Sequence, residues 1–358
     1  MIQTAENYKK ALAENLIIDD WQAIDILLAA VIAHKIDGEM VWLRLIGSAG
    51  TGKTEILISF SSLDGYCAKV ESLTPSSIRR GFVIDSDDER KMPTLLERIN
   101  GKLVITKELA PLLTANRELK LEVFGLLRSV HDGEVIADYG SRQGHISQSA
   151  TFDWILGSTR YIDRQSALDA QLGSRFIDLR WGAPLNRKAA VIKAMSNDGT
   201  LPAIRGILAK AMRDLIALPA TPDQCSCDNL DMSYLSDVAN FVSTYRTPVE
   251  RDTRDKELIL DIPDAELGTR VGQAFARLVK GMLLIGLTDY KPYVRRLAFD
   301  CLPPLRSACV KALLKGCRTE AELGQAMGVS HVTAHYTKED LKYLGLNQDT
   351  LSIIKGGE

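Results

Sequence analysis

Apolar and polar residues follow two spacings along this chain, and each spacing predicts a different kind of element. Over residues 5–38 apolar side chains recur every three to four positions, which predicts two helices, with Asp19 or Asp20 as the N-cap of the second. Apolar runs of strand length stand at 40–46, 67–70, 103–108 and 151–157. Helical spacing returns between them, most clearly over 116–131, so the pattern predicts an α/β fold.

The second half of the chain is predicted to be mainly helical. A long helix is expected from about 265 to 285, and Pro303-Pro304 interrupts the chain beyond it. Three shorter helices are expected at 305–315, 319–327 and 330–343, an order that predicts a helix-turn-helix. Residues 351–355 are interpreted as a short strand, which would complete a winged helix.

The most specific pattern lies between the first strand and the helix that follows it. It matches G-x-x-x-x-G-K-[ST], and we call it the phosphate loop: Gly47, Ser48, Ala49, Gly50, Thr51, Gly52, Lys53 and Thr54. Its glycines allow backbone N–H groups and the helix N-terminus to face a polyphosphate. Lys53 is predicted to reach the β- and γ-phosphates and Thr54 to ligate Mg²⁺, so ATP and Mg²⁺ are the expected ligands.

A carboxylate and a small polar residue end the next two expected strands. Glu108 closes the run at 103–108, and at that position its predicted role is either to hold Mg²⁺ or to orient the attacking water. Lys107 stands where many enzymes with a phosphate loop have a second acidic residue. Asp85 or Asp87 is the alternative source of that second carboxylate. Thr159, just past the strand at 151–157, is the predicted sensor of the γ-phosphate.

Bulk properties exclude several classes of protein. The formal net charge of −2 gives no overall basic field, so any nucleic-acid contact must come from a local patch. No apolar run approaches the length of a membrane span and the first residues lack a signal-peptide layout, so we expect a cytoplasmic protein with no membrane partner. The six cysteines include one close pair, Cys225 and Cys227, and are expected to be reduced thiols.

Taken in order, these patterns resemble the AAA+ family of ring-forming ATPases. The order is phosphate loop, strand ending in an acid, helix, short hairpin, sensor strand and then Ser174-Arg175-Phe176. The resemblance is strongest to the clade of the MCM helicases and enhancer-binding activators, and to compact ATPases of phages and mobile elements. The sigma-contacting loop of the activators is absent, which argues against transcription activation.

The resemblance implies roles for two arginines. In MCM-type proteins a Ser-Arg-Phe-Asp segment carries an arginine finger that reaches the neighbouring subunit's nucleotide; here Arg175 matches, although Ile177 stands before Asp178. Arg270, near the start of the helix at 265–285, matches the second sensor arginine, which contacts phosphate when the lid closes. The implied domains are 1–185 (nucleotide-binding core), 186–302 (helical lid) and 303–358 (winged helix), and the implied assembly is a homo-oligomer.

Two regions are candidate DNA contacts. The turn at 141–145, where this clade carries a pore hairpin, offers Arg142 and His145. The third helix of the helix-turn-helix offers Ser330, His331, Thr333 and Lys338.

The sequence therefore predicts an ATP-hydrolysing oligomeric motor acting on DNA, an MCM-like helicase or translocase. Two alternatives stay open. One is a nucleotide-gated remodeller or switch that acts on a protein partner, which the lone acid at Glu108 would suit. The other is a sequence-specific DNA-binding initiator or regulator that uses ATP to oligomerise.

Overall fold

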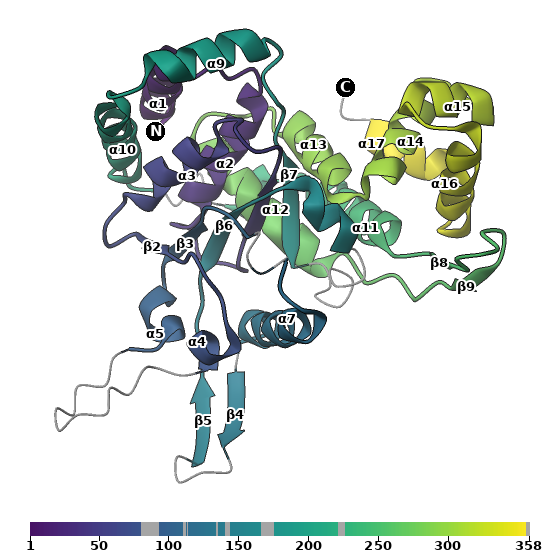
Figure 1. Ribbon diagram of the computed structural model, residues 1–358, viewed down its shortest axis with the longest axis horizontal. Coiled ribbons are helices and arrows are strands. Elements are labelled where there is room, and N and C mark those ends of the chain that lie inside the picture. Colours follow the sequence, from purple (N-terminus) through teal and green to yellow (C-terminus); the bar gives the residue numbers. More distant parts are fainter. Residues whose placement is uncertain are drawn as a thin grey trace.

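The centre of the structure, a computed structural model, is a parallel sheet with helices on both faces (Figure 1). The structure describes residues 1–79, 93–109, 112, 114–133, 135–139, 144–165, 175–220 and 226–355. Five strands pair in the order β2 (Cys67–Lys69), β3 (Leu103–Thr106), β6 (Asp153–Ser158), β1 (Trp42–Ile46) and β7 (Phe176–Arg180). All four contacts between them are parallel, which confirms the predicted α/β class.

Side chains alternate between two apolar cores, one on each face of the sheet. Trp42, Val104 and Trp154 point into the smaller core, under α4 (Pro75–Arg79), α5 (Leu95–Ile99) and α7 (Arg117–His131). Leu43 and Ile177 point into the larger core, which is covered by the N-terminal helices and by most of the second half of the chain. The central strands β1, β3 and β6 are buried on both faces and are mainly apolar, as the sequence pattern predicted.

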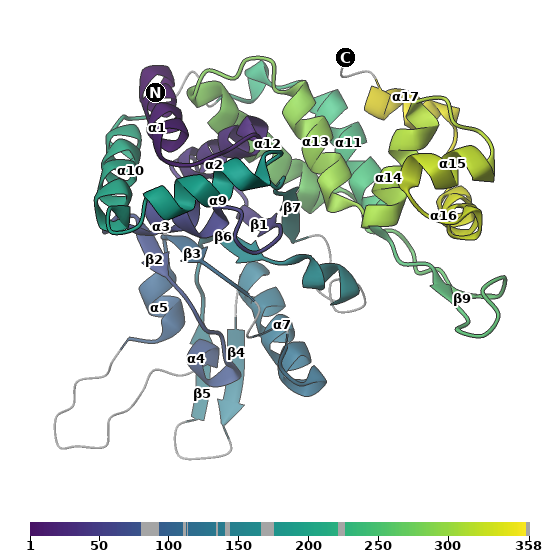
Figure 2. The same cartoon turned by 45° about the horizontal axis from the view of Figure 1, so that its top comes forward.

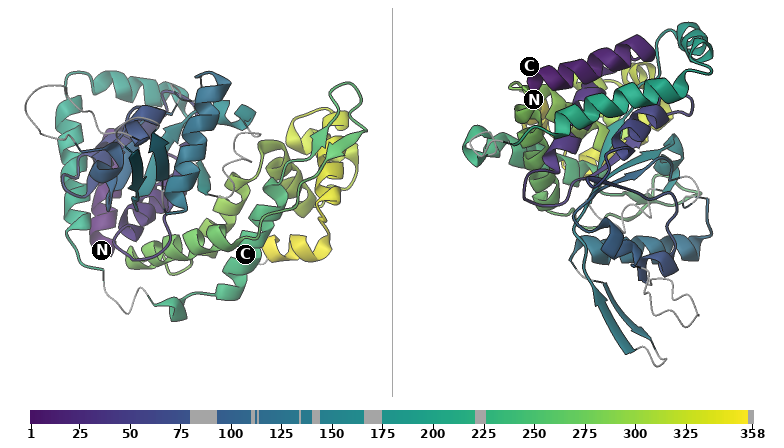
Figure 3. Two further views of the ribbon diagram at one scale, coloured as in Figure 1. Left: turned by 90° about the horizontal axis from the view of Figure 1, so that it is seen from below. Right: turned by 90° about the vertical axis from the view of Figure 1, so that its left-hand side faces the viewer.

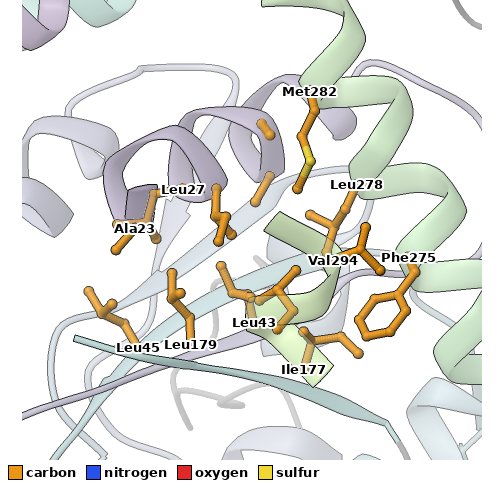
Figure 4. Packing of buried hydrophobic residues seen from close by; sticks show 14 of the residues in the cluster. Ala23, Leu27, Leu43, Leu45, Ile177, Leu179, Phe275, Leu278, Met282 and Val294 are labelled. Atoms are coloured by element: carbon orange, nitrogen blue, oxygen red, sulfur yellow. The ribbon is translucent and has the colours of Figure 1, made fainter. Parts of the chain in front are cut away.

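The larger core joins the N-terminal helices to the second half of the chain. The helices nearest the sheet and the N-terminus in this core include α1 (Ile2–Asn15), α2 (Trp21–Ala33), α3 (Lys53–Ser61), α10 (Leu201–Ile216), α11 (Met232–Arg246), α12 (Thr269–Leu284) and α13 (Lys291–Cys301), and the C-terminal helices continue it. Figure 4 shows Leu27 of α2 and Leu278 of α12 above the sheet residues Leu43 and Leu179. Gly281 permits this close packing, since a Cβ there would lie 2.2 Å from the Ala29 carbonyl oxygen.

A buried ion network fixes α12 to the start of β6. The Arg277 guanidinium donates to both carboxylate oxygens of Asp153, at 2.7 and 2.9 Å. The same carboxylate accepts a hydrogen bond from Val41 N and lies 2.6 Å from His34 Nδ1. Asp153 is 3% exposed, so α12 is held in the core by a fully paired buried charge.

Helix α13 covers the outer edge of β7. Arg180 N donates to the Asp300 carboxylate at 2.9 Å, and Asp178 N donates to Cys301 Sγ at 3.3 Å. Side chains of one helix thus take the place of a further strand, and this edge of the sheet is closed.

The C-terminal helices follow the predicted order. They are α14 (Pro304–Leu314), α15 (Glu320–Met327) and α16 (His331–Tyr343), with a Thr319–Glu322 capping box and Ser330 as the cap of α16. The predicted strand at 351–355 is wrong, because these residues belong to helix α17 (Gln348–Lys355). Asn347 Oδ1 accepts from Thr350 N, and Leu351 and Ile354, one turn apart, are buried in the larger core.

Two hairpins lie outside the central layers (Figures 2 and 3). The antiparallel pair β4 (Val135–Tyr139) and β5 (Gly144–Gln148) extends away from the sheet below α7, in the place the sequence predicted. The pair β8 (Glu250–Arg251) and β9 (Ile259–Asp261) lies beside α16, where Arg251 forms ion pairs with Glu339 and Asp340. The remaining elements are η1 (Arg160–Gln165), α9 (Arg187–Ser196) and η3 (Cys227–Asn229).

Candidate nucleotide-binding site

The phosphate loop lies at the carboxyl edge of the sheet, between the central strand β1 and helix α3. Gly50 and Gly52 have φ angles of +73° and +88°, a left-handed conformation that only glycine adopts without strain. Gly47 N donates to Ser158 O at 3.0 Å, which ties the start of the loop to the end of β6. No atom lies within 4 Å of the Cβ position of either Gly50 or Gly52, so open space adjoins the loop.

Lys53 is folded over the loop that carries it. Its ammonium donates to the carbonyl oxygens of Gly47 and Ser48, both at 2.6 Å, and the residue is 6% exposed. Burial lowers the pKa of Lys53, while the nearby negative charge of Glu108 raises it. The structure therefore places the predicted carboxylate near enough for its charge to act on the predicted lysine.

The strand ends bring Glu108, Thr159 and Thr54 to the same edge as Lys53. Glu108 stands two residues beyond β3, and Leu109 N donates to Gly157 O, which fixes this segment to β6. Thr159 follows β6 directly and is half-buried, whereas Thr54 is exposed at the first turn of α3. The Lys107 ammonium instead forms an ion pair with Glu71.

Gly157 is required where β6 passes the segment that carries Glu108. A Cβ at this position would lie 2.2 Å from the Lys107 carbonyl oxygen and 3.0 Å from Leu57 Cδ1. We expect Gly157→Ala to lower the free energy of unfolding by about 3 kcal/mol in a urea titration, because a backbone carbonyl cannot give way. The control is Gly206→Ala, exposed within α10 and free of neighbours, which should raise it by about 0.5–1 kcal/mol. Equal effects of the two variants would contradict this reason.

Two supporting contacts at this edge have no pattern in the sequence that would reveal them. Trp181 Nε1 donates to Thr51 O at 3.0 Å, and the Trp181 Cβ lies 2.9 Å from the Cβ position of Gly47. Arg205 of α10 donates to both carboxylate oxygens of Glu55, each at 2.8 Å, in the first turn of α3. Both contacts fix the loop and its helix from segments more than a hundred residues away.

The two predicted arginines meet at the opposite edge of the sheet. Arg175 Nη2 donates to both oxygens of Asp132, at 2.8 and 2.6 Å, and Arg270 Nη2 reaches the same carboxylate at 3.4 Å. Arg175 precedes Phe176, which pairs with the first residue of β1, whereas the phosphate loop follows the last. The length of a five-residue strand, about 15 Å, therefore separates this arginine pair from the phosphate loop.

Arg270 pairs with Asp132 away from its own phosphate loop, and α12 is anchored in the core by Arg277. The contact of Arg270 with phosphate in a closed lid therefore stays a prediction. The Arg175 side chain is 1% exposed and bound to Asp132, so it does not extend toward a neighbour in this conformation. Asp132, directly after the helix expected at 116–131, is the residue that joins both arginines.

His131, next to Asp132, is a buried neutral base. Its ring lies edge-on to Trp42, and burial, with the charge of Arg175 as the next cause, lowers its pKa to about 4. Below pH 6.5 the unfolded chain therefore binds a proton that the folded protein does not, so stability is complete above pH 6.5 and is lost as the pH falls toward 4. We expect this loss to reach about 3 kcal/mol, at about 1.4 kcal/mol for each pH unit.

Urea titrations between pH 4 and 7 check this prediction. Carboxylates titrate in the same range, so the relevant quantity is the difference between the wild type and His131→Gln, which cannot take up the proton. The advantage of the wild type should shrink steadily below pH 6.5; parallel curves for the two proteins would contradict the prediction.

The candidate DNA-contact residues are only partly placed on a shared surface. Arg142 lies outside the described residues, and His145 is in β5, paired with Asp138. On α16, His331 is exposed, whereas the hydroxyls of Ser330 and Thr333 lie 3.0 Å apart within the helix cap. Lys338 Nζ donates to Arg318 O and lies 3.7 Å from Glu320.

Comparisons with known proteins do not assign the chain to a family. No protein-family model matches the chain, and no curated protein matches it in sequence. Within the described parts of the chain, no helix is long and apolar enough to cross a bilayer. In the same residues, no group of three or more His, Cys, Asp or Glu side chains is arranged to hold a metal ion.

Proposed function

We propose that this protein is an Mg²⁺-dependent ATPase of the AAA+ type that works as a head-to-tail oligomer on DNA. The observation that carries the proposal is the phosphate loop at the carboxyl edge of a parallel sheet, with the Lys53 ammonium folded over it and Glu108 at the end of a neighbouring strand. Nucleotides bind at this edge in open α/β sheets, where loop N–H groups and a helix N-terminus face the phosphates.

The residues at this edge fit Mg²⁺–ATP. The exposed Thr54 hydroxyl and the Glu108 carboxylate are oxygen donors, the kind that Mg²⁺ prefers. Bound Mg²⁺ would neutralise charge on the phosphates, and the Lys53 ammonium would transfer its two hydrogen bonds from loop carbonyls to phosphate oxygens. Thr159 stands beside the loop as the group that detects the terminal phosphate.

The arginine pair supports an active site shared between subunits. Arg175 and Arg270 are too far from their own phosphate loop to act on it, and they share the single carboxylate of Asp132. In the proposed assembly both arginines face the nucleotide of a neighbour, whose phosphates replace Asp132 as their anionic partner. An arginine supplied by a second subunit neutralises transition-state charge and makes hydrolysis depend on assembly.

Mixing experiments test this shared site. Arg270→Ala should lower ATP hydrolysis about 10- to 100-fold, the value of one charge-assisted contact, without loss of nucleotide binding. Lys53→Ala is inactive at its own loop but retains its arginines, so mixing it with Arg270→Ala should restore part of the hydrolysis. Arg213→Ala, at an exposed position of α10 outside the arginine pair, is the control and should be unaffected. Activity that is merely additive in the mixture would contradict a site built from two subunits.

DNA as the substrate follows from the helix-turn-helix order and the β4–β5 hairpin, and it is tested separately. Steady-state hydrolysis should rise several-fold with single- or double-stranded DNA, and an unwinding assay then follows. A defined footprint at moderate salt, without unwinding, would instead support an initiator or regulator.

A second candidate is a nucleotide-gated remodeller of a protein partner. The observation that favours it is the outer face of α16, where Val332 and Tyr343 are 47% and 56% exposed while Lys338 is held by Arg318 O and Glu320. Such a face is more apolar than a phosphate-binding surface requires. Hydrolysis that is indifferent to DNA would favour this candidate.

A further inference from the structure

Helix α9 is ten residues long and none of its residues is buried. It is fixed at its ends: Asn186 caps it through a hydrogen bond from Ala189 N, Leu185 N donates to Asp19, and Asn197 Nδ2 donates to Asn15 O. An isolated helix of this length is marginal in water, and most helices are stabilised by an apolar face packed on the protein. Among the described residues, no side chain of α9 is buried by such packing.

The outer surface of α9 is apolar and basic. Three exposed apolar residues of the helix and Leu185, two residues before its start, form what we call the α9 patch: Leu185, Val191, Ile192 and Met195. Leu185 is 89% exposed and Met195 71%. The charged residues of this helix are all basic: Arg187, Lys188 and Lys193. A large exposed apolar group rimmed by one sign of charge marks an interaction site.

The segment around the β8–β9 hairpin has the complementary character. Over residues 250–267 seven acidic residues stand against three basic ones, a net charge of −4. Its exposed apolar residues, which we call the hairpin patch, are Leu258, Leu260 and Leu267, at 52%, 58% and 79% exposure. Arg251 fixes the hairpin to α16 through Glu339 and Asp340, so this surface is held in place.

The two patches cannot meet within one chain. Figure 1 shows α9 at the upper left of the molecule and the β8–β9 hairpin at its far right. The α9 patch begins a few residues after Trp181, which contacts the phosphate loop. The hairpin patch ends at Leu267, three residues before Arg270 of the arginine pair. Each patch thus adjoins one half of the proposed shared site.

We propose that the α9 patch of one copy docks on the hairpin patch of a second copy, head to tail. The orientation of the two copies in this inference rests on the proposed function. In that orientation the arginine pair of one copy lies at the phosphate loop of its neighbour, and the acidic hairpin of the first copy meets the basic helix α9 of the second. Because the two surfaces differ, the contact is heterologous and repeats from copy to copy. The site is then incomplete without the partner copy, which contributes both arginines.

Sedimentation velocity with Mg²⁺ and a non-hydrolysable ATP analogue tests the contact. The wild type should sediment as an oligomer, and Met195→Glu and Leu260→Glu should each shift it to monomer. Met232→Glu, a 54%-exposed methionine outside both patches, is the matched control and should assemble like the wild type. A monomeric wild type, or assembly by both patch variants, would overturn the proposal.

Mixing the two patch variants gives the decisive result. The Met195→Glu copy keeps an intact hairpin patch and the Leu260→Glu copy an intact α9 patch, so the mixture should form dimers and nothing larger. A mixture that stays monomeric would show that the patches are not each other's partners. The protein could also bind no ATP and still assemble in a way that depends on both patches. That result would refute the proposed function and still support the contact between the patches.

Discussion

Replacing Lys53 by alanine is expected to lower ATP hydrolysis by about 10²–10³-fold, the effect of removing one preorganised donor from a site of developing charge. The wild-type ammonium is held on the phosphate loop by two loop carbonyls, and in the proposed function it would bind phosphate oxygens from there. Steady-state release of phosphate measures the effect, and a fluorescent ATP analogue measures binding alongside it.

Lys35→Ala is the matched control for this variant. The Lys35 ammonium also donates to two backbone carbonyls, those of Ile216 and Leu218, and burial also lowers its pKa, but it lies on the chain after α2, away from the phosphate loop. It should lose stability without losing hydrolysis per folded molecule. Equal hydrolysis by wild type and Lys53→Ala would remove the basis of the proposed function.

Replacing Asp153 by alanine is expected to lower the free energy of unfolding by about 3–5 kcal/mol, since the Arg277 guanidinium would stay buried without an anion. The change also removes the acceptor for Val41 N and the partner of His34. Chemical denaturation followed by circular dichroism provides the measurement.

Two companion variants isolate the cause. Asp214→Ala breaks an exposed ion pair with Lys210 within one helix and should change stability by no more than about 0.5 kcal/mol. Adding Arg277→Met to Asp153→Ala removes the buried cation and should recover part of the loss. A double variant less stable than Asp153→Ala alone would show that packing, and not unpaired charge, causes the effect.

The sequence predicted what depends on local pattern. The apolar runs predicted four of the five strands of the sheet, β1, β2, β3 and β6, but not the edge strand β7. The glycine spacing of the phosphate loop and the cap of the second helix are likewise local, and of the two candidates Asp19 and Asp20 the structure has Asp20 as the cap. The strand predicted at 351–355 failed, because four apolar or small residues in a row fit both a strand and one turn of helix.

What the sequence did not predict depends on contacts between distant segments. Asp132 and Arg175 are 43 residues apart, and Arg277 and Asp153 are 124 apart. The residues next to each arginine do not indicate its partner. The local sequence around an arginine beside a strand is the same whether that arginine is exposed or paired with a buried carboxylate. The placement of Arg270 away from its own phosphate loop follows from the docking of α12 on α2, which only the folded core determines.

Strand β6 links the two edges of the sheet that the proposed mechanism uses. Asp153 at its first residue is bound by α12, and its last residue, Ser158, accepts the hydrogen bond of Gly47 N and precedes Thr159. A hydrogen-bonded strand between two parallel neighbours cannot slide without breaking both ladders. We therefore expect the strand, about 20 Å long, to move as a rigid unit. If an adjoining subunit displaced α12, the sheet would tilt as a whole and the phosphate loop would move with it.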